Sequence, residues 1–228
     1  MTDAASWHDS HASVFADRYT LSAAFRERER IWRTWIERFA TPVSAVLDAG
    51  CGPGVLSALA ARHAGSVLGI DPSPAMLAIA RERAGTTLNL RFREARIGDE
   101  AALDGARFDL VLCSSVLEYL PDWEAGLSFL GRSLRPGGTL LFSLPNLRSA
   151  YRWAETVRFH TTGRPAYRAM SRHAPGLARI EQALRRERLE PIATTTFGVV
   201  PVLSHIARPL GLASVTDTLR LVACRRPA

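Results

Sequence analysis

The segment VLDAGCGPG, Val46–Gly54, decides the fold of this chain. It follows a short apolar run and opens an amphipathic segment, which is the order of a buried strand, a turn and a helix. Glycines in the turn let a ligand approach where a side chain would collide. Asp71 ends the next predicted strand, where a carboxylate can accept hydrogen bonds from ribose hydroxyls. The loop and Asp71 together predict a nucleoside site.

The glycine spacing distinguishes two kinds of nucleoside ligand. The dinucleotide fingerprint GxGxxG would place a third glycine at position 55, which is Val55. Asp48, just before the loop, would repel a pyrophosphate but suits a cationic amino group. S-adenosylmethionine combines a nucleoside with an ammonium group, so we expect it as the cofactor and S-adenosylhomocysteine as its product.

Strands and helices are expected to alternate after residue 44, as in a parallel sheet covered on both faces. Ser73 is a natural N-cap and Pro74 suits the first helical position. The predicted strands cover residues 45–48, 66–71, 88–94, 108–114, 139–144, 192–197 and 219–224, and the predicted helices cover 55–62, 74–84, 123–134 and 177–188. Aromatic residues at helical intervals in the first 40 residues predict amphipathic helices over the edge or mouth of the sheet. Such aromatic stripes more often belong to the core than to a cofactor site, and a lid is the alternative role.

Four successive motifs resemble those of class I S-adenosylmethionine-dependent methyltransferases. They are DAGCGPG, GIDPSPAMLAIARERA, FDLVLCSSVLEYLPD and LRPGGTLLFSLPN, within residues 43–146. The resemblance, to the small-molecule type of the ubiquinone and biotin pathways, implies an α/β fold. This is a doubly wound, Rossmann-like, seven-stranded, mostly parallel sheet with an antiparallel last strand. We expect one methyltransferase domain over 1–228, with a helical lid at 1–40, a cofactor-binding core at 43–146 and acceptor-side segments at 147–228.

The resemblance also implies roles for residues around the cofactor. Asp48 and Gly50 would hold the methionine amino end, and Asp71 the ribose. Ser114 and Ser115 would lie near the transferred methyl group. The other residues expected at the cofactor are Tyr19, from a lid pattern with Phe15 and Ala16, and Cys51, Gly52, Gly54, Pro72, Ser73, Met76, Arg96 and Ile97. The alternative for each is a turn or packing role.

One position departs from the family pattern. After the third strand the family usually has an Asp that meets the adenine amino group, and counting places Arg96 there. Arg cannot accept that hydrogen bond. Either Asp99 replaces the missing acid after a shift in the loop, or Ala95 and Ile97 offer only backbone and apolar contacts.

Glu118 and Tyr119 are the first candidates for catalysis, because they follow the fourth strand where relatives often carry Glu and then His. A general base is needed only if the acceptor is protonated. His160 is a further candidate, as are His8, His11 and His173, since histidine titrates near neutral pH. The alternatives are a helix-start carboxylate for Glu118, a wall residue in Tyr119 and surface positions for the histidines.

Two segments are expected to cover an acceptor pocket. Residues 146–175 form a long insertion that mixes aromatic residues with arginines, and long insertions are often functional. Together with residues 198–213 it would roof a pocket for an aromatic or lipid-like acceptor, with an Arg available for an anionic group. Contact of the apolar stretch with a membrane surface is an open alternative.

The charge and cysteine content restrict the partners. The net charge is +7, with all 29 cationic side chains being Arg. Arginines between Arg148 and Arg188 could serve an anionic acceptor, an acidic carrier protein or a nucleic acid, although a solvated helical face is the preferred interpretation. The three cysteines lack metal-binding spacing, so free buried thiols are expected and no metal site. The chain shows no transmembrane pattern, and we expect a cytoplasmic location.

Three functions remain open. The first is an enzyme that methylates oxygen, or else nitrogen or carbon, on a small or medium-sized metabolite. The second is a non-catalytic S-adenosylmethionine-binding subunit, which Arg96 supports. The third is an RNA methyltransferase, which the basic composition favours, but SSVLEY stands where an NPPY-type loop would be. The oligomeric state is not predicted.

Overall fold

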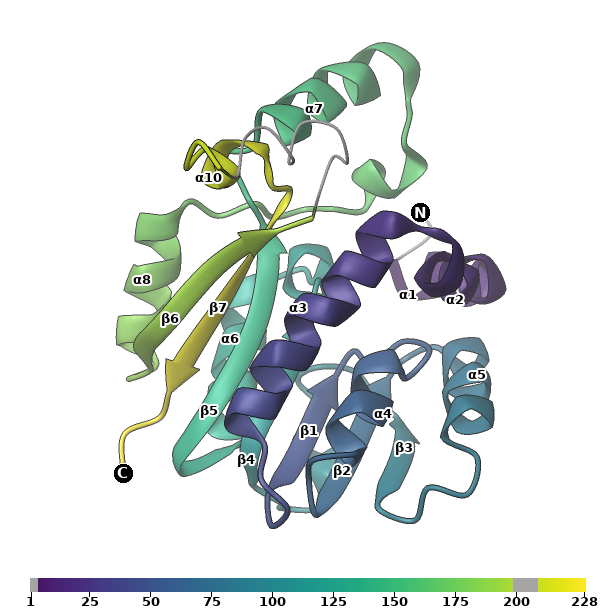
Figure 1. Ribbon diagram of the computed structural model, residues 1–228, viewed down its shortest axis with the longest axis vertical. Coiled ribbons are helices and arrows are strands. Elements are labelled where there is room, and N and C mark those ends of the chain that lie inside the picture. Colours follow the sequence, from purple (N-terminus) through teal and green to yellow (C-terminus); the bar gives the residue numbers. More distant parts are fainter. Residues whose placement is uncertain (1–3, 199–208) are drawn as a thin grey trace.

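A sheet of seven strands lies between two layers of helices in the computed structural model, which describes residues 4–198 and 209–228 (Figure 1). The strand order is β3-β2-β1-β4-β5-β7-β6. β7 runs antiparallel to its neighbours β5 and β6, and the remaining neighbours are parallel. The predicted doubly wound sheet with an antiparallel last strand is therefore confirmed.

The element boundaries follow the chain in order. The strands are β1 (Ala45–Ala49), β2 (Ser66–Asp71), β3 (Leu90–Glu94), β4 (Phe108–Ser114), β5 (Leu134–Pro145), β6 (Glu190–Phe197) and β7 (Leu219–Arg225). The α-helices are α1 (Ala4–Ser10), α2 (Ala12–Leu21), α3 (Ala23–Phe39), α4 (Val55–Ala61), α5 (Pro74–Ala84), α6 (Trp123–Arg132), α7 (Ala150–Thr162), α8 (Leu177–Arg186) and α10 (Ala213–Thr216). Short 3-10 helices are η1 (Glu100–Leu103), η2 (Leu117–Tyr119) and η3 (Ala166–Ala169).

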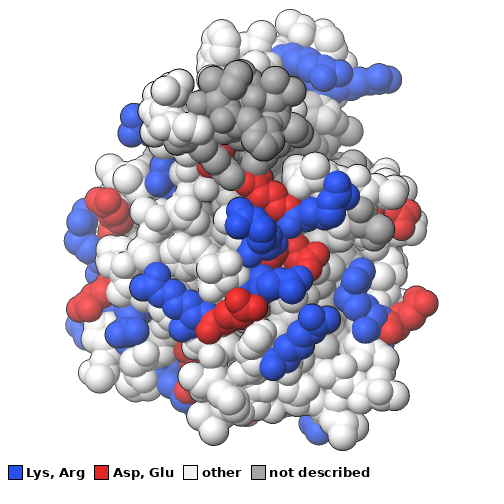
Figure 2. Space-filling view, in the orientation of Figure 1, with Lys and Arg blue, Asp and Glu red and all other residues white. Residues whose placement is uncertain are grey.

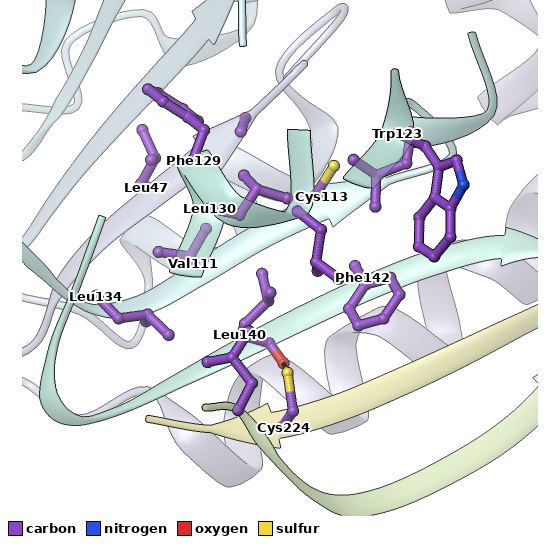
Figure 3. Close-up of a cluster of buried hydrophobic side chains, with 14 of the residues drawn as sticks. Leu47, Val111, Cys113, Trp123, Phe129, Leu130, Leu134, Leu140, Phe142 and Cys224 are labelled. Carbon is purple, nitrogen blue, oxygen red and sulfur yellow. Dashed lines mark hydrogen bonds between the residues drawn. The ribbon is translucent and has the colours of Figure 1, made fainter. Parts of the chain in front are cut away.

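One hydrophobic core lies between the sheet and the helices α6 and α8. Successive side chains of a strand point to opposite faces, so alternate residues of β1, β4 and β5 supply it. Phe142 of β5 points toward Trp123 at the start of α6 in this cluster (Figure 3). Cys224 is buried in the same layer, where its Sγ lies 3.8 Å from the Leu140 carbonyl oxygen, shown by a dashed line (Figure 3).

A second core lies on the opposite face of the sheet, beneath α3 and α4. Trp32 and Ile36 of α3 are fully buried there, one helical turn apart, and meet residues of the alternate strand positions such as Leu110 and Leu141. Burying each such side chain contributes roughly 2 kcal/mol to folding. The prediction that all N-terminal helices lie over the edge or mouth was therefore wrong for α3, which forms part of the core.

The predicted boundaries shift at several ends. β5 begins at Leu134 rather than at residue 139, because Leu134 pairs with Phe108 before the register shift. β3 begins at Leu90, and Leu88, which was assigned to it, is 95% exposed. The helices predicted to end at residues 134 and 188 stop two residues earlier, in α6 and α8.

The helices α1, α2 and α7 lie beyond the carboxyl ends of the parallel strands (Figure 1). α1 and α2 pack against α5, and α7 contacts α10. This edge is where ligands bind in open α/β sheets.

Candidate active site

A cavity of about 370 Å³ opens at the carboxyl ends of the central strands. Most of the residues that sequence analysis placed at the cofactor come together around it. Those that line it are Tyr19, Asp48, Gly50, Cys51, Gly52, Asp71, Pro72, Met76, Arg96, Ile97, Ser114 and Ser115. The roles assigned to them remain predictions.

The glycine loop between β1 and α4 is shaped by close packing on one side and open space on the other. Gly50 has φ +75°, and a Cβ there would lie 2.4 Å from Val116 Cγ2. Gly52 has φ +52°, but nothing lies within 4 Å of the position its Cβ would take. Both residues adopt a conformation that favours glycine. The space above Gly52 is where a ligand can approach the backbone.

Asp71, at the end of β2, joins the loop to the start of α5. One carboxylate oxygen accepts the Gly52 N–H at 2.9 Å and the other accepts the Ser73 N–H at 2.9 Å. Burial raises the pKa of Asp71, while these two hydrogen bonds act in the opposite direction. Each oxygen retains a lone pair that could accept a ligand hydroxyl.

A contact from α1 continues this network. Asp9 Oδ1 accepts the Ser73 hydroxyl at 2.6 Å and the Ala75 N–H at 3.1 Å. The Ser73 hydroxyl also caps α5 by accepting the Met76 N–H. α1 is thus attached to the same helix start that supports Asp71.

Asp48, at the end of β1, is 1% exposed. Its Oδ2 accepts the Ser57 hydroxyl at 2.6 Å. Burial raises its pKa to about 6, although the Ser57 hydrogen bond favours the ionised form. A buried carboxylate of this kind is stabilised by a cationic partner, so this end of the cavity suits an ammonium group.

Arg28 of α3 is a cavity residue that the sequence analysis missed. Its guanidinium donates to the Ser114 carbonyl oxygen at 2.8 Å and to the Ser114 Oγ at 2.6 Å. The side chain therefore spans from the N-terminal helices to the end of β4. Arg28 stands in a run of alternating Arg and Glu residues, and nothing in that local pattern distinguishes it from its solvated neighbours.

The segment after β4 carries two unusual features. Ser115 has φ +55°, a strained value for a side-chain-bearing residue, and its N–H donates to the Ser143 Oγ at 3.0 Å.

Glu118 is 2% exposed, and its Oε2 has no hydrogen-bond partner among the described residues. Burial raises the pKa of Glu118 to about 7. At neutral pH the Glu118 carboxyl group can therefore either hold or release a proton.

The two catalytic candidates after β4 occupy different places. Tyr119 lines the cavity, whereas Glu118 is buried beside it and does not line it. Burial, followed by the charge of Glu118, raises the pKa of Tyr119. The tyrosine hydroxyl accordingly keeps its proton at neutral pH and is a hydrogen-bond donor.

Some of the predicted site residues lie elsewhere. Gly54 faces α5 and β3: a Cβ there would lie 2.9 Å from Ala80 and 3.0 Å from Phe92, so this glycine permits close packing. His160 is exposed on α7 beside Phe159 and does not line the cavity. His11 stacks on Trp7.

The remaining candidates are His173, His8 and the expected roof of the pocket. His173 Nε2 lies 3.1 Å from the Pro121 carbonyl oxygen. The side chain of His8 and residues 199–208 of the expected pocket roof lie outside what the structure describes.

The loop after β3 bears on the two alternatives raised by Arg96. Asp99 Oδ1 accepts the Ala102 N–H and caps η1, and Asp99 does not line the cavity. Ala95, Arg96 and Ile97 do line it. The geometry favours backbone and apolar contacts at this end over a replacement acid.

Comparison with known proteins finds similarity in the central segment of the chain, which holds most of the cavity residues. Residues 46–138 match a family model described as a methyltransferase domain. Within these residues the chain is therefore similar to methyltransferase domains.

The methyltransferase domain is similar to several curated proteins over part of their length. A ubiquinone biosynthesis O-methyltransferase of Hahella chejuensis is 37% identical over 111 residues, which are 48% of this chain and 47% of that protein. Another, from Acinetobacter baylyi, is 31% identical over 147 residues, 63% of this chain and 58% of that protein. The matched region spans about half the length of these relatives.

Solved structures share the fold over nearly the whole chain. The N-methyltransferase NodS of Bradyrhizobium japonicum, solved with S-adenosylhomocysteine, has a TM-score of 0.66 at 20% identity and covers 92% of this chain and 91% of its own. The magnesium protoporphyrin IX methyltransferase of Synechocystis has a TM-score of 0.70 at 17% identity, covering 96% and 98%. These similarities support the fold of the methyltransferase domain.

The cysteines and the surface charges complete the description of the chain. The three cysteines are free and buried. Within the described ranges, no group of His, Cys, Asp and Glu side chains is arranged to hold a metal ion, and no helix is long and apolar enough to cross a bilayer. Arginines alternate with acidic side chains on the face that carries α3 (Figure 2).

Proposed function

We propose that the chain transfers a methyl group from S-adenosylmethionine to an oxygen atom of a small or medium-sized acceptor with an aromatic or apolar body. The observation that carries this proposal is the set of charged groups in one cavity: the buried Asp48, Asp71 beneath the glycine loop, and Arg28. The similarity to proteins named as O-methyltransferases of ubiquinone biosynthesis favours oxygen and a ubiquinone-pathway type of acceptor.

The residues of the cavity fit the cofactor group by group. Asp48 would face the methionyl ammonium, and Arg28 would bind the methionyl carboxylate, since their opposite charges match the two ends of a zwitterion. Asp71 would accept the ribose hydroxyls with its remaining lone pairs, and the backbone at Gly52 leaves room for the ligand. Ala95 and Ile97 would contact adenine.

When bound, S-adenosylmethionine supplies an electrophilic methyl group on a sulfonium with a good leaving group. The protein therefore has to orient the acceptor oxygen and exclude water. Phe15 and Tyr19 of α2 line the cavity and would cover it from the side of the helical lid, residues 1–40. The acceptor would enter from the side of residues 147–228.

Removal of the acceptor proton would involve the segment after β4. Glu118, with a pKa of about 7, is the group that can take up a proton at neutral pH. Because Glu118 does not line the cavity and Tyr119 does, the Tyr119 hydroxyl would accept the acceptor proton while passing its own proton to Glu118. His160 has no such position.

Two measurements test the proposal. Isothermal titration with S-adenosylmethionine and S-adenosylhomocysteine should show binding of both, and Asp48→Asn should weaken it while Asp17→Asn, on the exposed face of α2, should not. Methyl transfer to a panel of phenols, hydroxy acids and carrier-linked acyl groups should yield a methyl ether or ester. Binding without turnover on any acceptor would favour a non-catalytic subunit, and absence of binding would refute the proposal.

A further inference from the structure

Three arginines, Arg28 and Arg172 in the cavity wall and Arg152 of α7 outside it, differ in how they are engaged. Arg28 is bonded to Ser114. Arg152 of α7 donates to the Thr218 carbonyl oxygen and lies 3.5 Å from Glu155 Oε2. Among the described residues, the guanidinium of Arg172 makes no hydrogen bond or ion pair, although it lines the cavity. Arg172 therefore presents an uncommitted cation at the acceptor end.

The position of Arg172 is set by its backbone. The N–H groups of Arg172 and His173 donate to the Glu118 carbonyl oxygen at 2.8 and 3.2 Å. The His173 ring adds a contact with the Pro121 carbonyl oxygen. The loop that follows η3 is thus attached to η2, the segment that carries Tyr119. The cation is held next to the wall where the acceptor would lie.

Acidic groups near this position do not offset its charge. Glu155 accepts the Tyr167 hydroxyl at 2.5 Å and pairs with Arg152. Glu118 is buried behind the wall, and burial raises its pKa to about 7. Of Arg28, Arg152 and Arg172, only Arg172 has a guanidinium with no hydrogen-bond or ion-pair partner in the part of the chain that the structure describes.

Apolar side chains line the same cavity as Arg172. They are Phe15, Val116, Leu120 and Pro121. Such a wall accommodates an aromatic or aliphatic body by burying its surface. A ligand that satisfies both features has an apolar body and one anionic group.

We propose that the acceptor carries a negatively charged oxygen group, a carboxylate or a phosphate, which the Arg172 guanidinium binds while the apolar body lies against Leu120 and Phe15. This inference rests on the proposed function and specifies its substrate class. A guanidinium can bind either anion with two parallel hydrogen bonds, which gives selectivity over a neutral isostere.

The test uses the full chain loaded with S-adenosylhomocysteine and matched probe pairs. The pairs are salicylate and salicylamide, caffeate and caffeamide, decanoate and decanamide, and phenyl phosphate and phenol. Isothermal titration measures each affinity for the wild type, for Arg172→Gln and Arg172→Lys, and for the control Arg158→Gln on the exposed side of α7.

We expect the anion of at least one pair to bind about 30-fold more tightly than its neutral partner, as a charged hydrogen-bonded pair allows. The carboxylate and phosphate pairs show which anion is preferred. Arg172→Gln should abolish this preference, Arg172→Lys should keep part of it, and Arg158→Gln should keep all of it.

Two results would overturn the inference: no pair shows an anion preference in the wild type, or Arg172→Gln retains it. The S-adenosylhomocysteine titration separates these from a failure of the proposed function, because only the latter abolishes cofactor binding in the wild type. Unchanged cofactor affinity in Arg172→Gln also shows that this variant is folded.

Discussion

The cofactor end and the acceptor end of the cavity are built from different kinds of contact. At the cofactor end, the strand ends β1 and β2 place Asp48 and Asp71, and backbone N–H groups from a tight glycine loop complete the site. At the acceptor end, the walls come from α2, η2 and the loop after η3, which lie far apart in the sequence. The first is a product of local backbone geometry, and the second of tertiary packing. Variants at each end should therefore fail in different ways.

The largest effect is expected for Asp48→Asn at the cofactor end. Loss of the charge that faces the ammonium should weaken S-adenosylmethionine binding about 100-fold, the upper range for a charged hydrogen bond. In the wild type, affinity should fall as the pH drops below about 6, because the carboxylate is then protonated, with a limiting slope of about tenfold per pH unit. Titration calorimetry between pH 5 and pH 8 measures both. A wild-type affinity that stays constant across this range would contradict the role of Asp48.

Two glycine variants separate packing from ligand access within the loop. Gly50→Ala places a methyl group 2.4 Å from Val116 and should lower the free energy of unfolding by about 2 kcal/mol. Gly52→Ala meets open space and should cost only about 1 kcal/mol for its positive φ, yet it should weaken cofactor binding at least about tenfold. Urea denaturation and cofactor titration give the two quantities. Equal losses of stability would show that the loop has no distinct packed and open sides.

The Glu118→Gln variant tests the buried carboxylate near the acceptor end by its effect on the free energy of unfolding. The folded-state pKa of about 7 exceeds the ordinary value of 4.5, so the folded protein binds the proton more tightly and loses stability as the pH rises from about 4.5 to 7. The glutamine variant lacks this loss and should be more stable than the wild type by about 2 kcal/mol at pH 8, with little difference at pH 4.5. Urea denaturation at both values is the measurement, with the exposed Glu190→Gln as control. The same pH dependence in wild type and Glu118→Gln would rule out this burial effect.

The smallest effect is expected for Asp9→Ala, which removes the link between α1 and Ser73. Amide hydrogen exchange in α1 and α2 should accelerate, while exchange in the sheet stays unchanged. Cofactor affinity should fall only a few-fold, since Asp71 keeps both of its backbone donors. Asp17→Ala, exposed on α2, is the matched control. Unchanged exchange in α1 would mean that other contacts hold this helix.

Much of the cofactor end could be predicted because its signals are local. Ser73 and Pro74 fix the start of α5 at the predicted residue, and apolar runs define β1, β2 and β4. Gly50 and Gly52 lie in the predicted turn and have positive φ angles. The start of β5 was predicted five residues too late, because the pairing of Leu134 with Phe108 is a long-range contact with no local signature.

The acceptor end could be predicted only in outline. Tyr119 was expected there and lines the cavity, but Arg172 was not singled out, and neither was Arg28 beside the proposed methionyl site. Both belong to segments in which arginine is frequent, and the preferred interpretation for residues 148–188 was a solvated face. That face exists in part, since Arg179 and Arg186 pair with Glu124 at the surface.

The sequence by itself determined the strand and helix order, the glycine loop and the acids that end β1 and β2, because backbone propensity and apolar periodicity act over a few residues. Only the tertiary structure decided which arginines enter the cavity. A guanidinium looks the same in sequence whether it is solvated, paired or free to bind a ligand. Its role depends on neighbours brought close by folding, as Ser114 is to Arg28, 86 residues away.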